Sequence, residues 1–269
     1  MTKRPSLTIV GTGFLVAGQV TPESWSAIQV SDRFFFIVGE PATRLWLEQQ
    51  HPRAESLHDV FWDGRPRQPA YDEIVARILA PLHQGLDVCA AFYGHAGVFV
   101  YSSHEAIRQA RAAGFTASML PAVSAEDCLF ADLEIDPARD GCQSFEATDF
   151  LARKRAFDPR SGLVLWQIGA LGVVHYYHRD LWNRDGLDYL VEVLRRSYPA
   201  DHPVVVYEHM QLPVCPPLIQ RTALAALPRC TINTHSTLWV PPVAKAPVDE
   251  AMLARIRTSS LHRLYAEAV

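Results

Sequence analysis

Two short turns carry the residues best placed to do chemistry. The turn 93–97 reads Tyr-Gly-His-Ala-Gly and follows the apolar run 86–92, whereas 121–125 reads Pro-Ala-Val-Ser-Ala and follows the strand-like run 115–120. Taken singly, each turn is better explained as a simple chain reversal by Gly or Pro. However, strands that alternate with helices predict a parallel sheet, whose ligands bind outside the carboxyl ends of its strands. We therefore expect both turns to line one ligand pocket.

A third turn, Gly11-Thr12-Gly13, suggests a different chemistry, the binding of a dinucleotide. It follows the strand-like run 6–10, but the G-x-G-x-x-G fingerprint needs a third glycine where this chain has Val16. Glu40 has a suitable position for an acid that binds ribose. The next helix, however, begins only after Thr21, too late to direct its N-terminus at a pyrophosphate. The sequence therefore disfavours NAD binding.

The elements that must position these turns form two halves of an α/β protein. An N-terminal domain is predicted over 1–138, with strands at 6–10, 33–38, 86–92 and 115–120 and helices at 22–30, 41–50, 69–83 and 102–113, and with a loop at 54–67. A boundary near 139–141 opens a second domain, 139–245, with strands at 162–168, 203–208 and 238–240 and helices at 186–197 and 218–227. The remainder, 246–269, is predicted to be a C-terminal helix whose apolar stripe contains Met252, Ile256, Leu261 and Leu264.

The two turns and their surroundings resemble the borosin peptide N-methyltransferases of the tetrapyrrole-methylase superfamily. The likeness is carried by Tyr-Gly-His-x-Gly-Val-Phe at 93–99 and by Met-Leu-Pro-x-Val-Ser-Ala-Glu-Asp-Cys-Leu-Phe-Ala-Asp-Leu at 119–133. It continues through 135–137, 141–142 and 146–151 and extends to about Pro242. The resemblance implies a two-domain tetrapyrrole-methylase-like fold that binds S-adenosylmethionine (SAM) in the cleft between its domains.

The resemblance also implies which residues contact SAM. They are Tyr93, His95, Val98, Ala125, Gln167, Ser236 and Thr237. We add Phe99 and Ser124 from the two turns, and Val206 and Tyr207 from a strand that should lie near the adenine. SAM carries a sulfonium cation, an adenine and an amino-acid tail, so its pocket needs apolar walls, backbone hydrogen bonds and little positive charge. The two turns can supply these features. A purely structural hydrogen bond explains Gln167 equally well, because a polar group in an apolar strand needs a partner.

The resemblance implies Arg67 and Tyr71 as catalytic candidates, and His58, where the chain departs from the family, is a third. An amide nitrogen is a poor nucleophile because its lone pair is delocalised into the carbonyl. Its methylation therefore needs a proton acceptor at the N–H and a donor or cation at the oxygen. Arg67 suits the oxygen because it stays charged and has five donors, and Tyr71 suits the proton. Spacing alone would favour a solvated loop charge at Arg67.

The chain departs from the family pattern at two positions where tyrosines are usual. These positions hold His58 and Phe61, with Trp62 beside them. Phe61 has no proton to share, whereas the His58 imidazole either acts as a base near neutral pH or simply packs. The departure keeps open a weakly active module that binds SAM and a peptide, and the superfamily keeps open a tetrapyrrole substrate. Between the two candidate bases, we favour Tyr71.

The amino-acid composition limits the kinds of partner and the cellular compartment that we expect. Of 269 residues, 49% are hydrophobic and 20% charged, and the net charge of −4 argues against nucleic acid as the main partner. The five cysteines include no CxxC pair, which favours buried thiols in a reducing compartment over a metal site. No apolar run is long enough to span a membrane, so we expect a cytoplasmic protein. The resemblance further implies a homodimer that methylates a separate precursor peptide in trans, because few residues follow Pro242 and they do not resemble a core peptide.

Overall fold

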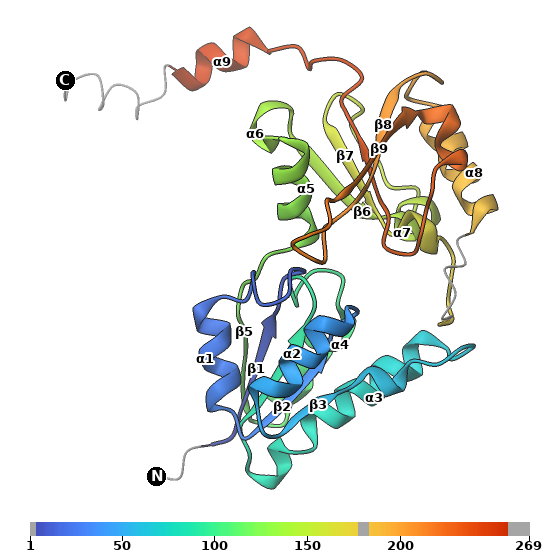
Figure 1. Ribbon diagram of the computed structural model, residues 1–269. Coiled ribbons are helices and arrows are strands. Elements are labelled where there is room, and N and C mark those ends of the chain that lie inside the picture. Colours follow the sequence, from blue (N-terminus) through green and yellow to red (C-terminus); the bar gives the residue numbers. More distant parts are fainter. Residues whose placement is uncertain (1–3, 177–182, 258–269) are drawn as a thin grey trace.

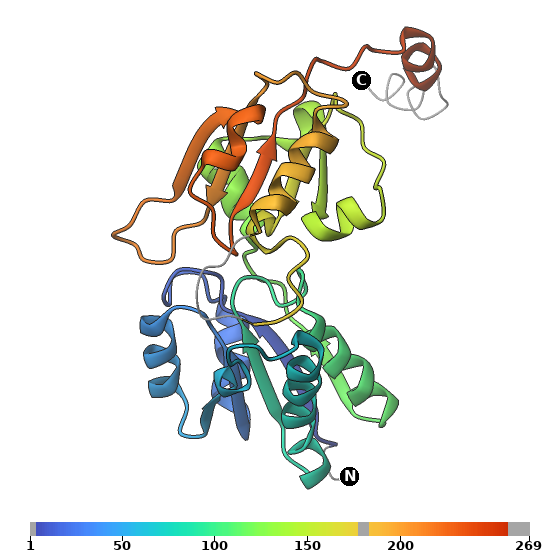
Figure 2. The same ribbon diagram turned by 90° about the vertical axis from the view of Figure 1, so that its right-hand side faces the viewer.

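The computed structural model describes residues 4–176 and 183–257 and contains two sheets, one in each half of the chain. Figures 1 and 2 show the two halves stacked end to end, each with helices on the faces of its sheet. The predicted α/β class with two halves is therefore confirmed.

The first sheet is parallel throughout and has the order β3-β2-β4-β1-β5. Its strands are β1 (Ser6–Gly11), β2 (Arg33–Ile37), β3 (Ala54–Ser56), β4 (Val88–Phe92) and β5 (Thr116–Met119). All five residues of β4 are buried, as expected for a central strand covered on both faces. Because β1 lies between β4 and β5, the turns that follow these three strands meet at one edge of the sheet.

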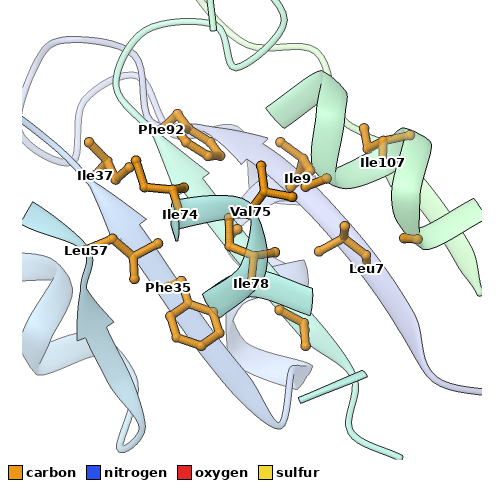
Figure 3. Packing of buried hydrophobic residues seen from close by; sticks show 14 of the residues in the cluster. Leu7, Ile9, Phe35, Ile37, Leu57, Ile74, Val75, Ile78, Phe92 and Ile107 are labelled. Atoms are coloured by element: carbon orange, nitrogen blue, oxygen red, sulfur yellow. The ribbon is translucent and has the colours of Figure 1, made fainter. Parts of the chain in front are cut away.

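Helices cover both faces of this sheet. On one face lie α1 (Pro22–Val30) and α2 (Pro41–Gln50), and on the other lie α3 (Arg67–Leu79) and α4 (Tyr101–Ala112). The apolar side of α3, which includes Ile74 and Ile78, packs on Leu7, Phe35 and their neighbours (Figure 3). The predicted ranges 22–30 and 41–50 are confirmed, and the Thr21 side chain caps α1 by accepting a hydrogen bond from the Ser24 amide at 3.1 Å.

The second sheet is mixed and has the order β6-β7-β10-β8-β9. Its strands are β6 (Cys142–Glu146), β7 (Gly162–Trp166), β8 (Pro203–Glu208), β9 (Leu218–Ala223) and β10 (Thr237–Val240). Only the β6–β7 pair is parallel among these described strands; the others are antiparallel. One face packs on α7 (Ala147–Ala152) and α8 (Arg184–Leu194), and the other on α5 (Ala125–Leu133).

Three sequence-based assignments differ from the structure. The predicted helix 218–227 is wrong, because 218–223 form β9, which pairs along all of β8, and 224–229 form a 3₁₀ helix that contains Pro228. The predicted loop 54–67 contains the short strand β3. By packing, α5 goes with the second sheet, although the predicted boundary after 138 placed it with the first; Leu129 is buried against Val164 and Trp239.

The chain continues through the short helix α6 (Pro137–Asp140) and, near its end, the helix α9 (Glu250–Arg257). No residue of α9 is buried, and the helix lies away from both sheets in Figures 1 and 2. Met252 and Ile256 of the predicted apolar stripe are exposed, whereas Leu261 and Leu264 lie outside the described residues. No helix in the described ranges is long and apolar enough to cross a membrane.

Candidate active site between the two halves

The turns after β1, β4 and β5 meet at the edge of the first sheet that faces the second half. The backbones of Gly13 and Gly94 exchange hydrogen bonds of 3.2 and 2.7 Å. A Cβ atom on Gly11 would overlap the Gly94 carbonyl oxygen and the Ala122 side chain, so this close approach requires a glycine. The 11–13 turn, which at first suggested dinucleotide binding, therefore builds the base on which the two predicted turns rest.

The β4 turn is held rigidly by its own side chains. The His95 Nδ1 atom accepts a hydrogen bond from the Gly97 amide at 2.9 Å, and the Ser103 hydroxyl of α4 donates to the carbonyls of Ala96 and Val100. His95 thus braces the turn.

Three apolar side chains of the same segment remain exposed. Tyr93, Val98 and Phe99 keep 41%, 40% and 51% of their surface exposed. Phe99 has a left-handed backbone with φ of 56°, and its ring centroid lies 5.9 Å from that of Trp166 at the end of β7. Strained backbone of this kind is concentrated at functional sites. The turn therefore offers an apolar wall where the two halves meet.

Opposite this wall, Ser124 and Ala125 begin α5. The Ser124 hydroxyl and the Asp127 carboxylate form a reciprocal capping box, with the Ser124 amide 2.7 Å from Asp127 Oδ2. The hydroxyl of Ser124 is thus engaged in the cap, and Ala125 packs at the edge of the core between α5 and the second sheet. The structure brings both residues to the carboxyl end of β5, as predicted.

On the second sheet, the buried Ser236 belongs to a partly buried polar network that sequence reasoning did not find. Its hydroxyl donates to Glu208 Oε1 at 2.5 Å and accepts from the Asn233 amide at 2.9 Å, and the Asn233 side chain donates to Glu208 Oε2 at 2.8 Å. We call Glu208, Asn233 and Ser236 the Glu208 network. The signal in the sequence was Glu208 itself, a carboxylate directly after the apolar run of β8.

Gln167 is brought to the Glu208 network by the backbone. The amide of Ile168 donates to the carbonyl of Ser236 at 3.0 Å, which joins the end of β7 to the start of β10. Gln167 itself has a left-handed backbone, with φ of 58°. Thr237, the first residue of β10, is buried. Gln167, Ser236 and Thr237 therefore lie together where β7 ends and β10 begins.

A pocket of about 200 Å³ adjoins this network. Its lining includes Glu208, His209, Met210, Asn233 and His235. The ring of His209 contacts that of Phe14 from the first half, with 3.6 Å between centroids. Burial, together with the nearby His235, lowers the pKa of His209 to about 4, so its ring is neutral at pH 7. A partly apolar pocket with the Glu208 carboxylate in its lining fits the needs of an adenine and a sulfonium cofactor.

Val206 and Tyr207 directly precede Glu208 in β8. Both side chains are buried in the core of the second half, and their strand pairs with β9 and β10 on its two sides. The Tyr207 hydroxyl donates to Asp132 of α5 at 2.7 Å. Tyr207 is the cross-strand partner of Thr237, and the residues that follow it, Glu208 to Met210, line the pocket.

Arg67 and Tyr71 lie one helical turn apart at the start of α3, where residues four apart share a face. The ring of Tyr71 is 6.0 Å from that of Tyr101, the first residue of α4. From the second half, the Tyr176 hydroxyl approaches that of Tyr71 at 3.4 Å, and the Arg67 guanidinium lies 5.4 Å from the Tyr176 ring centroid. We call Arg67, Tyr71, Tyr93, Tyr101 and Tyr176 the arginine–tyrosine cluster. Sequence reasoning missed Tyr176, which lies in a segment without clear periodicity.

Backbone hydrogen bonds between residues 64–67 and 174–176, which we call the strap, hold this cluster together. The Gly64 amide donates to the Tyr176 carbonyl and the Tyr176 amide to the Arg65 carbonyl, both at 2.8 Å, and the Arg67 amide donates to the Val174 carbonyl at 3.1 Å. The loop itself is fixed by Arg65, which is buried and bonds to the Val60 carbonyl at 2.6 Å and the Glu73 carboxylate at 2.7 Å.

The electrostatics of the cluster combine a cation with neutral phenols. Desolvation, and then the nearby Tyr71, raise the pKa values of Tyr93 and Tyr176, and Arg67 opposes both increases. The Nε atom of Arg67 is buried and has no hydrogen-bond partner among the described residues. A buried donor on a cation normally has an acceptor, which this atom lacks among the described residues.

His58 lies at the outer edge of this cluster. Its side chain is exposed, and its ring meets that of Phe61 edge-on, with 5.5 Å between centroids. The Phe61 ring in turn lies 4.4 Å from that of Tyr176. The three catalytic candidates are therefore brought into one region, with His58 outermost. Within the described ranges, no group of three His, Cys, Asp or Glu residues could hold a metal ion.

Known proteins resemble this chain in sequence and in fold. The model of the family described as Tetrapyrrole (Corrin/Porphyrin) Methylases matches residues 6–213. The methyltransferase/ribosomally synthesized cyclic peptide gymnopeptides precursor of Gymnopus fusipes is 39% identical over 241 residues, which are 88% of this chain and 57% of the relative. The corresponding omphalotin A precursor of Omphalotus olearius is 38% identical over 259 residues, 95% of this chain and 62% of the relative.

The chain thus spans about three-fifths of the length of these curated relatives. Among solved structures, the uroporphyrin-III-C-methyltransferase of Thermus thermophilus is similar in fold, with a TM-score of 0.64 and 18% identity over 93% of this chain and all of that one.

Proposed function

The chain belongs to the tetrapyrrole (corrin/porphyrin) methylase family, and we propose that it is a SAM-dependent methyltransferase that acts on the backbone amides of a peptide. The observation that carries the peptide substrate is the buried, unpartnered Nε of Arg67 on the same helix face as Tyr71. An amide presents both groups that such a pair can address, an oxygen for the guanidinium and an N–H for the phenol. The similarity to precursors of ribosomally made cyclic peptides supports this assignment.

In the proposed reaction, bound SAM supplies a methyl group on a sulfonium sulfur. The Arg67 guanidinium holds the amide oxygen, where negative charge develops as the N–H bond breaks. The amide proton moves to the Tyr71 oxygen, the nitrogen electron pair forms the new bond to carbon, and the pair of the broken S–C bond returns to sulfur. We assign the proton to Tyr71 rather than His58, because Tyr71 shares a helix face with Arg67.

The cofactor would lie between the β4 turn and the Glu208 network. Tyr93, Val98 and Phe99 would form its apolar wall, the backbone of 94–98 would supply hydrogen bonds, and Gln167 with Ser236 and Thr237 would close the other side. The exposed apolar surface of that turn and the neutral ring of His209 support this placement.

The substrate we propose is a separate precursor peptide, and the enzyme we propose is a cytoplasmic homodimer. Support for the dimer comes from α9, which has no buried residue and exposes Met252 and Ile256, with 46% and 61% of their surfaces uncovered. The second candidate substrate is a tetrapyrrole, favoured by the description of the family. Against it stands the higher identity to the peptide precursors than to the porphyrin enzyme.

The test is methyl transfer by the purified protein. It is incubated with SAM and either an apolar peptide of the cyclic-peptide type or a porphyrinogen, and intact mass is measured in steps of one methyl group. Calorimetry with SAM and light scattering on the same preparation test the cofactor and the dimer. Peptide methylation supports the proposal; methylation of the porphyrinogen alone, or SAM binding without transfer to any peptide, contradicts it.

A further inference from the structure

We infer that Tyr176 is a positioning residue for the proton transfer, because its hydroxyl holds the Tyr71 oxygen by a donated hydrogen bond. The inference rests on the proposed function in one respect, that Tyr71 accepts the amide proton. It assigns a role to a residue in the other half of the chain, 105 positions away from Tyr71.

The geometry places Tyr176 for this role through three independent contacts. Its main chain is fixed on both sides by the strap, in which its amide bonds to Arg65 and its carbonyl to Gly64. Its ring lies between the Phe61 ring, at 4.4 Å, and the Arg67 guanidinium, at 5.4 Å. Its hydroxyl is then directed to Tyr71, at 3.4 Å. Hydrogen bonds of this length in a site without substrate commonly shorten when substrate binds.

The protonation of Tyr176 fixes the direction of the hydrogen bond. Desolvation, followed by the influence of Tyr71, raises the pKa of Tyr176 far above its usual value, so its hydroxyl keeps its proton throughout the working range. A neutral hydroxyl beside a phenolate is a donor, and a bond donated to the charged form stabilises that form. Tyr176 therefore favours the deprotonated Tyr71 that can accept the amide proton, and its own proton stays in place during the reaction.

The other titratable groups around Tyr71 set the background for this effect. Arg67 on the same helix also favours a phenolate, whereas Tyr93 and Tyr101 come from the β4 turn and α4 and carry no charge when protonated. His58 lies beyond Phe61. Removing the Tyr176 hydroxyl leaves this background unchanged, so its contribution can be measured separately.

The structure also offers a matched rescue. Phe61 lies in ring contact with Tyr176 but lacks a hydroxyl, at a position where the sequence resemblance led us to expect a tyrosine. If a hydroxyl in this space is what Tyr71 requires, then Phe61→Tyr should replace the one removed by Tyr176→Phe. A purely structural role of Tyr176 predicts no such rescue, because Tyr176→Phe keeps the aromatic ring.

The experiment compares the protein with Tyr176→Phe, Phe61→Tyr and the double variant Phe61→Tyr/Tyr176→Phe. First, the titration of Tyr71 is followed by NMR of ring-labelled tyrosine, assigned with Tyr71→Phe, in the presence of SAM and without peptide. We expect Tyr176→Phe to raise the pKa of Tyr71 by about one pH unit, and the double variant to reverse most of the shift. The pH–rate profile of methyl transfer should show the same displacement, with kcat reduced about tenfold at neutral pH and KM for SAM unchanged.

An unchanged Tyr71 titration in Tyr176→Phe overturns the inference, whatever happens to the rate. A lower rate without rescue in the double variant also overturns it. The NMR titration needs no turnover, so it decides the role of Tyr176 even if the peptide assay fails and the proposed function falls. If Tyr176→Phe does not fold, the double variant carries the test, and a Tyr71 pKa near that of the unmodified protein supports the inference while a raised one overturns it.

Discussion

The arginine–tyrosine cluster and the Glu208 network satisfy their polar atoms in opposite ways. In the Glu208 network both carboxylate oxygens accept hydrogen bonds of 2.5 and 2.8 Å from within the protein. In the cluster the Arg67 Nε has no partner among the described residues, and the bond between the two tyrosine hydroxyls is long at 3.4 Å.

The contrast indicates that the two groups of residues have different roles. Groups that are fully bonded within the protein hold a fixed scaffold, since removing one partner leaves another buried group unsatisfied. Groups with spare donors can bind something that arrives later. Two neighbouring arginines show the same contrast. Arg65 donates hydrogen bonds to the Val60 carbonyl and the Glu73 carboxylate, whereas the Nε atom of Arg67 has no acceptor among the described residues.

The largest effect should come from Arg67→Lys. Lysine keeps the charge but loses the planar arrangement of donors, so we expect the rate of methyl transfer to fall about a hundredfold or more. SAM affinity and thermal stability should stay close to those of the unmodified protein. Single-turnover kinetics and calorimetry measure these quantities. Full activity would mean that Arg67 is a solvated charge, and the contrast with the Glu208 network would be lost.

Glu208→Gln should have the opposite profile. The amide keeps one acceptor but loses charge-assisted bonds to Ser236 and Asn233, so we expect a loss of about 1.5–3 kcal/mol in the free energy of unfolding. Urea unfolding measures this loss. SAM affinity should also weaken, whereas the pKa of Tyr71 should not move. Stability equal to that of the unmodified protein would show that the network is not part of the scaffold.

The smallest effect concerns His209 and pH. Its pKa is lowered to about 4 in the folded protein, compared with about 6.5 in the unfolded chain. Above pH 6.5 the ring is neutral in both states, but between pH 6.5 and 4 only the unfolded chain takes up a proton. The free energy of unfolding should therefore decrease as the pH is lowered from 6.5 to 4, by about 1–3 kcal/mol. In His209→Gln this part of the pH dependence should disappear; an identical slope in urea titrations at several pH values would refute the assignment.

Local sequence determined much of the first half. Alternating apolar runs and caps predicted the parallel sheet, and the Thr21 cap together with Pro22 and Pro41 fixed the limits of α1 and α2. The placement of Ser124, Ala125 and the β4 turn at one sheet edge followed from the same rule, since the carboxyl ends of parallel strands share an edge.

Tertiary structure decided what local patterns could not express. Residues 218–223 became a strand because β8 offered an edge to pair with, which outweighs weak helical preference. Tyr207 and Thr237 were brought opposite each other by the pairing of β8 with β10. Tyr176 and Asn233 entered the site through contacts with residues 105 and 25 positions away. Such partners leave no periodic signal in the chain, because only the folded arrangement of the two halves brings their atoms within bonding distance.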